Sequence, residues 1–472
     1  MKLRTLSSIP PTALLLLPWA ALTGFALRTD AYGLTEEGSK AILLAWSIGD
    51  QVASAVFTLG APDIRVIFFL PLGFLWPGQI VAAKLMTLAV MAAAGVALYS
   101  WRARDDQAEA ALLASGLLLI APLTIGGIDA LSAGPYLLLI FAMADWVNRR
   151  LTRERGTMGG WFFAQLLLCG AAVSLHPAGV AYPMVLVRSW LAIPHDRRDR
   201  QVALLGIPST VLFVLVMRLG WNGLAWAQSP LTAAAVFGGS RPPDTWSGAD
   251  WFGGIALIGL TLTVAVHERR RLLADLTGGS LLLGTLFGLA AADRTWGLLL
   301  LALLLYGGFP WLLRACAPLV SRGVMLQRGW LWVLLLMLCT LFMRANQGDF
   351  EAGRRHFLSA EDGLISAFTE EVGRASDAAP TGDHAAPLLV ASPWPARTSI
   401  ACQCAALPLP PAAQDPDSQL AMMRGVSYVI LSDTLESRAL AANFSQLGSR
   451  AEVLAKQPGG VILRLLPPRA AR

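Results

Sequence analysis

The chain has 472 residues, of which 55% are hydrophobic and only 14% are charged, and its formal net charge is +6. Soluble domains average about 25% charged residues, so a set of soluble domains is excluded by composition. The basic residues stand in short clusters between apolar segments, and the positive charge therefore does not predict nucleic-acid binding. The five cysteines contain no CxxC pair, so their spacing predicts no metal site. These observations predict a polytopic membrane protein.

Apolar segments of near-membrane length recur along the chain, since a helix needs about 20 apolar residues to cross the hydrocarbon core. Eleven segments are predicted spans: 11–27, 64–100, 108–125, 130–147, 161–175, 177–193, 203–220, 251–266, 277–292, 295–313 and 329–344. Pro71 and Pro77 predict breaks in 64–100, whose first half is interpreted as an interfacial or partly inserted helix. The stretch 161–193 is short for two crossings, so one long tilted helix is the alternative.

The placement of basic clusters predicts the orientation, because Lys/Arg-rich short loops stay in the cytoplasm. Such clusters mark residues 2–4, 102–104, 149–155, 197–200, 269–271 and 314–328. The alternation is consistent if 64–100 crosses once and 161–193 crosses twice. We expect a mainly α transmembrane bundle of about eleven spans, with the N-terminus inside and the C-terminus outside. The first segment resembles a signal peptide, but an uncleaved helix is preferred because ten further spans need no separate export signal.

Composition changes near residue 345, which predicts a transmembrane module over 1–345 and a small periplasmic α/β domain over 346–472. Strands are predicted in APLLVAS and VSYVILS, helices in SQLAMMRG and ESRALAANFSQLG, and a strand pair in AEVLAKQPGGVILRLL. The domain contains no glycine-rich phosphate loop, HExxH or GxSxG motif. It is therefore expected to cover or recognise something at the membrane surface. A disulfide between Cys402 and Cys404 would be strained, so two free thiols are predicted.

Acidic residues gather in the first predicted outer loop, 29–63, within RTDAYGLTEEGSKAILLAWSIGD. The residues from Glu36 to Asp50 have apolar side chains at helical spacing, which predicts a helix lying on the membrane surface. The helix dipole favours carboxylates at a helix N-terminus, and this alone explains one glutamate of the pair Glu36-Glu37. Asp30 and Asp50 have a structural alternative as solvated loop residues.

Asp129 is predicted to lie in a second, very short outer loop at 126–129, between two apolar segments. A carboxylate at that depth is costly unless it is paired, hydrated or bound to a metal ion. An N-cap role for the following helix is the structural alternative, and it is compatible with a functional role.

In this order, these segments resemble the GT-C glycosyltransferases, in particular the branch with protein O-mannosyltransferases and the lipid A aminoarabinose transferase. TEEGSKAILLAWSIGD is similar to the family's Asp-Glu start, surface helix and Gly-Asp finish. APDIRVIFFLPLGFLWPGQIVAAKL resembles its proline-rich, aromatic second span with a basic residue. IAPLTIGGIDALSAGPYLLLIFAMA resembles its second outer loop with an Asp, and SLHPAGVAYPMVLV resembles its small-residue hairpin. The resemblance covers nearly the whole chain, and the order of the segments is more specific than any one of them.

The resemblance implies an enzyme at the outer face of a bacterial inner membrane. Such an enzyme moves a hexosyl or pentosyl group from a polyprenyl-phosphate donor to a lipid, glycan or protein acceptor. Asp30, Glu36 and Asp129 are the candidate catalytic acids, since transfer needs a carboxylate to accept the acceptor's proton. The family's catalytic Asp aligns with Glu36, so either Glu36 replaces it, or Asp30 acts with Glu36 as its partner, or activity has been lost.

The leaving lipid phosphate needs positive charge, from basic side chains or a divalent metal ion. Lys40, Arg65, Arg354 and Arg355 are candidate phosphate contacts, and Glu37 and His356 are candidate metal ligands. Anchoring to anionic lipid heads is the alternative for the cluster at 354–356. Two other classes stay open: a non-catalytic scaffold in an envelope polysaccharide or secretion assembly, and a transporter of lipid-linked sugars.

Overall fold

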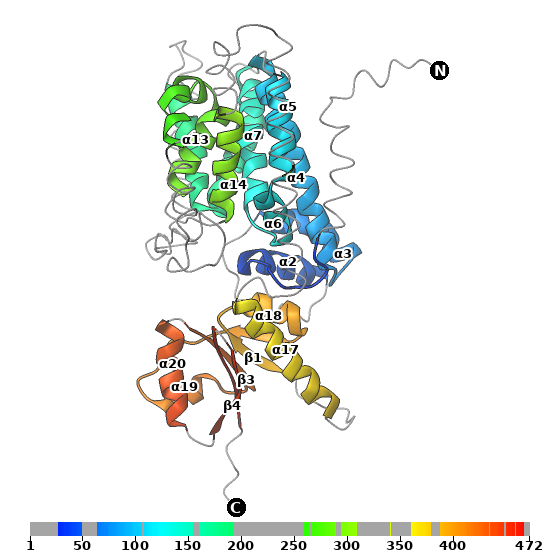
Figure 1. The fold of residues 1–472 in the computed structure, drawn as a ribbon, viewed down its shortest axis with the longest axis vertical. Helices are drawn as coiled ribbons and strands as arrows, with labels where there is room; N and C mark the ends of the chain where they lie inside the picture. The colour runs from blue at the N-terminus through cyan, green and yellow to red at the C-terminus, as the bar shows by residue number, and fades with distance from the viewer. Residues whose placement is uncertain are drawn as a thin grey trace, which may run out of the picture. The chain divides into compact units, whose positions relative to one another are not determined.

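The computed structural model describes two compact units of the chain (Figure 1). The described residues are 27–49, 64–105, 108–153, 160–191, 259–288 without 260 and 265, 294–308, 340, 360–378, 388–433, 435–447, 450–457 and 459–466. The helical unit comprises the described parts of 1–27, 59–68 and 84–349, and the mixed unit those of 28–58, 69–83 and 350–472. The C-terminal part of the mixed unit begins at Phe350, and residues of the first outer loop group with it. The division at 345 into a transmembrane module and a periplasmic domain stays a prediction.

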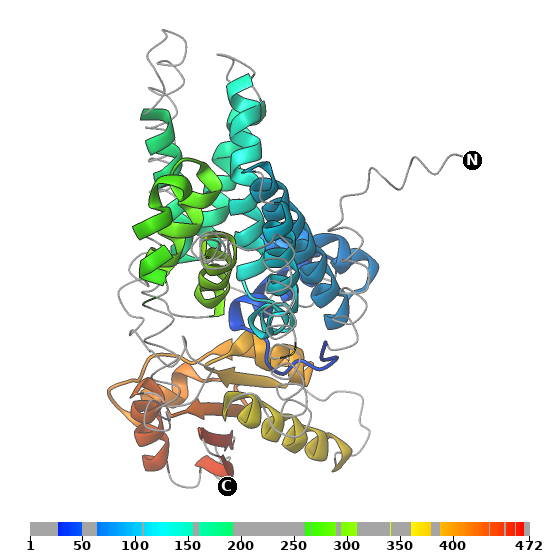
Figure 2. The ribbon, with the colours of Figure 1, turned by 45° about the horizontal axis from the view of Figure 1, so that its top comes forward.

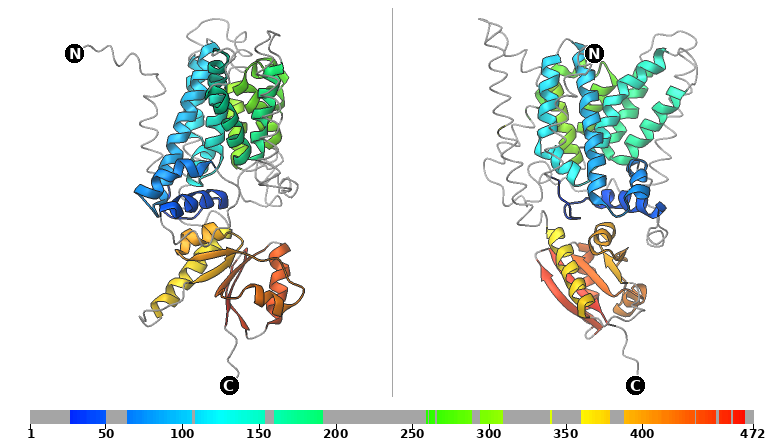
Figure 3. Two further views of the ribbon diagram at one scale, coloured as in Figure 1. Left: turned by 180° about the vertical axis from the view of Figure 1, so that it is seen from behind. Right: turned by 90° about the vertical axis from the view of Figure 1, so that its right-hand side faces the viewer.

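The helical unit consists of apolar helices that run alongside one another in both views of Figure 3. Its elements are α4 (Ile80–Arg102), η3 (Ala103–Asp105), α5 (Ala108–Ile120), α6 (Pro122–Asp129), α7 (Gly134–Arg153), α8 (Gly160–Leu175), η4 (Pro177–Val180), α9 (Ala181–Leu191), α13 (Leu276–Gly288), α14 (Arg294–Leu303) and the π-helical turn η7 (Leu304–Gly308). Among the described helices, α4 alone is long and apolar enough to cross a membrane, and α5 with α6 passes as a pair bent by 50°.

The predicted segment 64–100 forms two helices, α3 (Arg65–Leu75) and α4. The break lies at Trp76–Gln79, where Pro77 is followed by Gly78 at φ +77°. Glycine adopts such a left-handed conformation without steric cost. The prediction that Pro71 breaks the segment is wrong, because Pro71 lies inside α3.

The stretch 161–193 is interrupted at His176, which caps the short helix η4 by accepting a hydrogen bond from Ala178 N at 3.1 Å. The chain then passes so close to α8 that a β carbon on Gly179 would overlap the carbonyl of Ala172. The alternative interpretation of 161–193 as one long helix is therefore wrong. The count of eleven spans stays a prediction, since 203–220 and most of 11–27 and 329–344 lie outside the described residues.

The mixed unit contains a five-stranded sheet with the strand order β2-β1-β3-β5-β4. Figure 2 shows strands of this sheet as orange and red arrows. The strands are β1 (Leu389–Ser392), β2 (Ala405–Pro408), β3 (Tyr428–Ser432), β4 (Ala451–Gln457) and β5 (Gly460–Leu465). β1 pairs in parallel with β2 and β3, whereas β5 pairs antiparallel with β3 and β4. The helices of this unit are α2 (Glu36–Gly49), α17 (Ala360–Ala378), α18 (Pro395–Cys402), α19 (Pro416–Met422) and α20 (Leu435–Gln446).

Alternating side chains of β3 give the sheet two apolar faces. Val429 and Leu431 pack with Phe444 of α20, whereas Ile430 packs with Phe368 of α17. The predicted strands in 386–392, 426–432 and 451–466 and the predicted helices in 418–425 and 436–448 are confirmed. β2 and α18 were not predicted.

The prediction of free thiols at Cys402 and Cys404 is wrong, because their sulfur atoms are bonded to each other. The residue between them, Gln403, ends α18 in the left-handed conformation at φ +52°. This turn brings the two Cα atoms to 5.2 Å, within the usual range for a disulfide.

Candidate functional site

The first outer loop forms a capped helix whose first turn carries the acidic pair. Thr35 precedes α2, and its Oγ1 accepts a hydrogen bond from Gly38 N at 3.1 Å, as expected of an N-cap threonine. Ala41 and Ala45 are buried by protein, and a β carbon on Gly73 of α3 would overlap the carbonyl of Ala45. The predicted helix is confirmed, but at Ala41 and Ala45 its apolar face contacts protein rather than a membrane surface.

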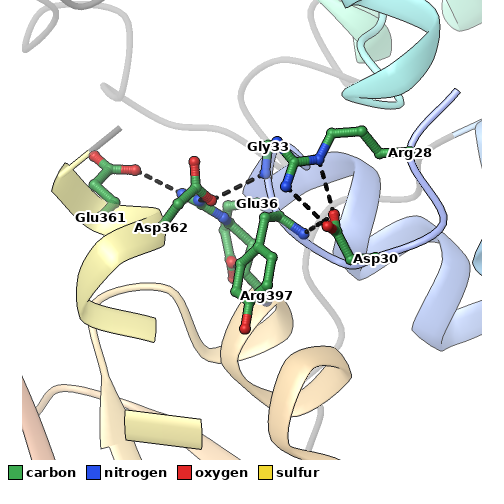
Figure 4. A network of polar contacts seen from close by, with 8 residues as sticks. Arg28, Asp30, Gly33, Glu36, Glu361, Asp362 and Arg397 are labelled. Atoms are coloured by element: carbon green, nitrogen blue, oxygen red, sulfur yellow. Dashed lines mark hydrogen bonds and ion pairs between the residues drawn. The ribbon is translucent and has the colours of Figure 1, made fainter. Parts of the chain in front are cut away.

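The Glu36 carboxylate is held at the N-terminus of α18 (Figure 4). Its two oxygens accept hydrogen bonds from Ala396 N at 3.1 Å and Arg397 N at 3.2 Å, and Lys40 Nζ lies 3.8 Å from Oε1. Burial raises the pKa of the Glu36 carboxyl above its ordinary value, while these N–H groups and the Lys40 charge oppose the shift without cancelling it. Glu37 beside it is exposed.

Asp30 has a different partner from that of Glu36. Arg28 binds both of its carboxylate oxygens, with Nε at 3.0 Å from Oδ1 and a terminal guanidinium nitrogen at 2.8 Å from Oδ2. Tyr32 N also donates to Oδ1 at 3.2 Å. The Asp30 side chain is 41% exposed, so this acid is paired and still open to solvent.

The prediction that Asp129 lies in an outer loop is wrong, because residues 126–129 form the last turn of α6. The alternative of an N-cap is also wrong, because α7 begins only at Gly134. A negative charge is unfavourable at a helix C-terminus, where the helix dipole is itself negative. Lys84 of α4 offsets this charge, with its Nζ 2.6 Å from Asp129 Oδ1. The Lys84 side chain is fully buried, and that of Asp129 is 15% exposed.

A second buried cation binds the turn that follows α6. Arg65 donates a hydrogen bond to the carbonyl oxygen of Leu131 at 2.7 Å. Leu131 has φ +53°, an uncommon conformation for a non-glycine residue and one that often marks a functional segment. The helical unit thus brings together two of the predicted site residues, Arg65 and Asp129, with one further buried cation, Lys84.

Lys84 was not among the predicted site residues. A lysine within an apolar segment is a functional candidate by default, because a buried charge there is expensive. That signal was present, since Lys84 is the basic residue in the segment that resembles the second span. The predicted phosphate contacts Arg354 and Arg355 and the predicted metal ligand His356 lie outside the described residues.

The described part of the chain contains no group of three His, Cys, Asp or Glu side chains placed to hold a metal ion. A groove of about 480 Å³ is lined by residues of α4, η3 and α7, among them Ala93, Trp101 and Met143, and Arg104 and Asp145 also line it. None of the candidate acids lines this groove. The expectation that the loop-one acids and Asp129 surround one cavity stays a prediction.

No protein-family model and no curated protein sequence matches the chain. Among solved structures, the chain is similar to ArnT from Cupriavidus metallidurans, whose crystal structure is described as bound to undecaprenyl phosphate. The two chains share 14% sequence identity, with a TM-score of 0.52 over 96% of this chain and 97% of ArnT. The protein therefore has the fold of ArnT, and this fold agrees with the resemblance stated from the sequence.

Proposed function

We propose that the chain is a membrane glycosyltransferase that takes a sugar from a polyprenyl-phosphate donor at the outer face of a bacterial inner membrane. The observation that carries this proposal is the similarity, over nearly the whole of both chains, to ArnT bound to undecaprenyl phosphate. The charge pattern of the loops supports the outer face, because it leaves loop one and the C-terminal residues outside. The acceptor is a lipid, a glycan or a protein.

The candidate residues fit the two charges that transfer develops. A loop-one carboxylate, Glu36 or Asp30, would accept the acceptor's proton as the acceptor attacks the anomeric carbon. Each Glu36 oxygen accepts one backbone N–H and keeps further acceptor capacity for this role. The departing lipid phosphate gains negative charge, which the buried cations Lys84 and Arg65 would stabilise. A divalent metal ion at the phosphate would add the same kind of stabilisation.

The direct test is a donor-turnover assay with purified full-length protein in detergent. We expect the wild-type chain to release undecaprenyl phosphate from at least one member of a panel of undecaprenyl-phosphate-linked sugars when envelope lipids and glycans are supplied. The double variant Asp30→Asn/Glu36→Gln should release none, because both candidate bases are then neutral. Mass spectrometry of envelope glycans and glycoproteins from a deletion strain would name the sugar and the acceptor. Failure of the wild-type chain on every donor would contradict the proposal.

The pH dependence of the same assay tests Glu36 as the base. Because burial raises its pKa, kcat/KM should rise with pH along a limb that lies above the range of an ordinary glutamate. Lys40 lowers this pKa, so Lys40→Met should move the limb to higher pH. Glu37 raises it, so Glu37→Gln should move the limb to lower pH. A limb that neither substitution moves would assign the base to another residue.

A non-catalytic scaffold is the second candidate function. The observation in its favour is that the residue aligned with the family's catalytic Asp caps α18 instead of standing free. If the chain is a scaffold, the purified protein should not turn over any donor. Expression of the Glu36→Gln variant in the deletion strain should then restore the wild-type phenotype fully.

A further inference from the structure

Arg397 lies at the centre of a polar network that joins loop one to the C-terminal residues within the mixed unit (Figure 4). Its two terminal guanidinium nitrogens donate to Glu361 Oε2 and Asp362 Oδ1, each at 2.6 Å. The side chains of Arg397 and Asp362 are 7% and 2% exposed. A buried, short and charge-assisted contact of this kind is geometrically specific, unlike an exposed ion pair.

The same network reaches the backbone of loop one at Gly33. The Gly33 N–H donates to Asp362 Oδ1 at 2.9 Å, so one carboxylate oxygen accepts from both Gly33 and Arg397. Gly33 has φ +78°, a conformation that glycine adopts readily and other residues rarely do. The contact therefore fixes the chain direction three residues before Glu36.

The second connection is the cap that Glu36 supplies to α18. The N-cap residue of α18, Trp394, makes no side-chain cap hydrogen bond, and Pro395 has no N–H to offer. The next two N–H groups, of Ala396 and Arg397, are those that Glu36 accepts. A helix N-terminus favours a carboxylate, so Glu36 satisfies donors that α18 cannot satisfy from its own sequence.

Arg397 takes part in both connections, through its backbone N–H to Glu36 and through its side chain to the acid that holds Gly33. We propose that Arg397 is a positioning residue, which holds the loop-one segment from Gly33 to Glu36 in the geometry that transfer requires. The inference rests on the proposed function, in which this segment carries the candidate base. A displacement of about 1 Å at a reacting group can lower a rate 10²-fold, so such a clamp has a kinetic consequence.

Arg397 lies outside the apolar clusters that hold the sheet. Those clusters pack Val429 and Leu431 on one face and Ile430 with Phe368 on the other. The guanidinium touches only their edge, through the ring of Trp394, whose centroid lies 5.7 Å from Arg397 Cζ. Replacing Arg397 should therefore release loop one while the sheet remains folded. This separates a positioning role from a general role in stability.

The experiment compares full-length wild type with Arg397→Gln, Arg397→Lys and the control Arg438→Gln. Arg438 also pairs with an aspartate in this unit, but the two side chains are 63% and 65% exposed. In Arg397→Gln, hydrogen exchange in peptides covering 28–40 and 394–400 should accelerate about tenfold or more, while peptides covering β3 keep their protection. Arg397→Lys keeps the charge but lacks the two-nitrogen fork, so its exchange should be intermediate. Arg438→Gln should match the wild type.

In the transfer assay, Arg397→Gln should lower kcat on the order of 10-fold or more and leave the KM for the donor nearly unchanged. Unchanged exchange in 28–40, or loss of protection in β3 together with loop one in both Arg397 variants, would overturn the proposal. A loss expressed only in KM would overturn it as well. A wild-type chain with no donor turnover would contradict the proposed function, whereas the exchange comparison would still decide whether Arg397 holds loop one.

Discussion

Conversion of the general base to its amide should lower the transfer rate on the order of 10²-fold or more, and we expect this for Glu36→Gln or Asp30→Asn. The amide keeps the shape of the side chain but cannot accept the acceptor's proton. Both side chains belong to loop one, and neither is part of the apolar clusters of the sheet. Expression and membrane insertion should therefore stay near wild type. The measurement is the rate of undecaprenyl phosphate release at saturating donor.

Glu36→Asp separates the base from the cap at this position. Aspartate keeps the charge but is one methylene shorter, so it cannot hold both N–H groups of α18 at their present distances of 3.1 and 3.2 Å without movement. If Glu36 is the base, Glu36→Asp should retain more activity than Glu36→Gln. If Glu36 only caps α18, the order should reverse, because the glutamine oxygen still reaches an N–H group. Full activity in Glu36→Gln and Asp30→Asn alike would remove both residues from catalysis.

The second large effect is expected at the ion pair between Lys84 and Asp129. Lys84→Met removes one charged partner of a partly buried carboxylate, and Asp129→Asn removes one charged partner of a fully buried ammonium group. Breaking a buried pair from one side destabilises a protein by about 3–5 kcal/mol. Each single variant should therefore melt at lower temperature in detergent and accumulate less in the membrane. The expected loss of stability in Asp129→Asn follows from the ion pair with Lys84. Substitution of a solvated acid in an outer loop by its amide would leave the stability nearly unchanged.

The double variant Lys84→Met/Asp129→Asn should recover most of the lost stability, because neither charge remains without the other. It should nevertheless stay inactive if these charges serve the donor phosphate. Arg149→Gln is the matched control, since Arg149 is 52% exposed and Asp145 keeps its contact with Arg104 at 3.1 Å. Its effect should stay within about 1 kcal/mol. Additive losses in the double variant would contradict a coupled pair.

Local sequence pattern was sufficient to predict the helix that starts at Glu36 and the strands around Val390 and Val429. It also predicts a membrane protein. Helical and strand periodicity are properties of neighbouring residues, and the apolar alternation of β3 is visible without knowledge of its partners. The order of acidic loop, aromatic span and small-residue hairpin was also sufficient to indicate the GT-C resemblance, which the shared fold with ArnT confirms. The short strand β2 and the helix α18 were not predicted, because elements of four and eight residues contain too little periodic signal.

Only the tertiary structure decided which charges meet. Glu36 and Ala396 are 360 residues apart in the sequence, and Lys84 and Asp129 are 45 apart. An acid in a sequence carries the same charge whether it caps a distant helix, pairs with a lysine or faces solvent, so its role depends on the path of the chain. The positions of Asp129 at the end of α6 and of Cys402 beside Cys404 depended in the same way on turns, at Leu131 and Gln403, that use left-handed backbone. Residues other than glycine enter that conformation only when the surrounding contacts hold them there, which no local pattern reveals.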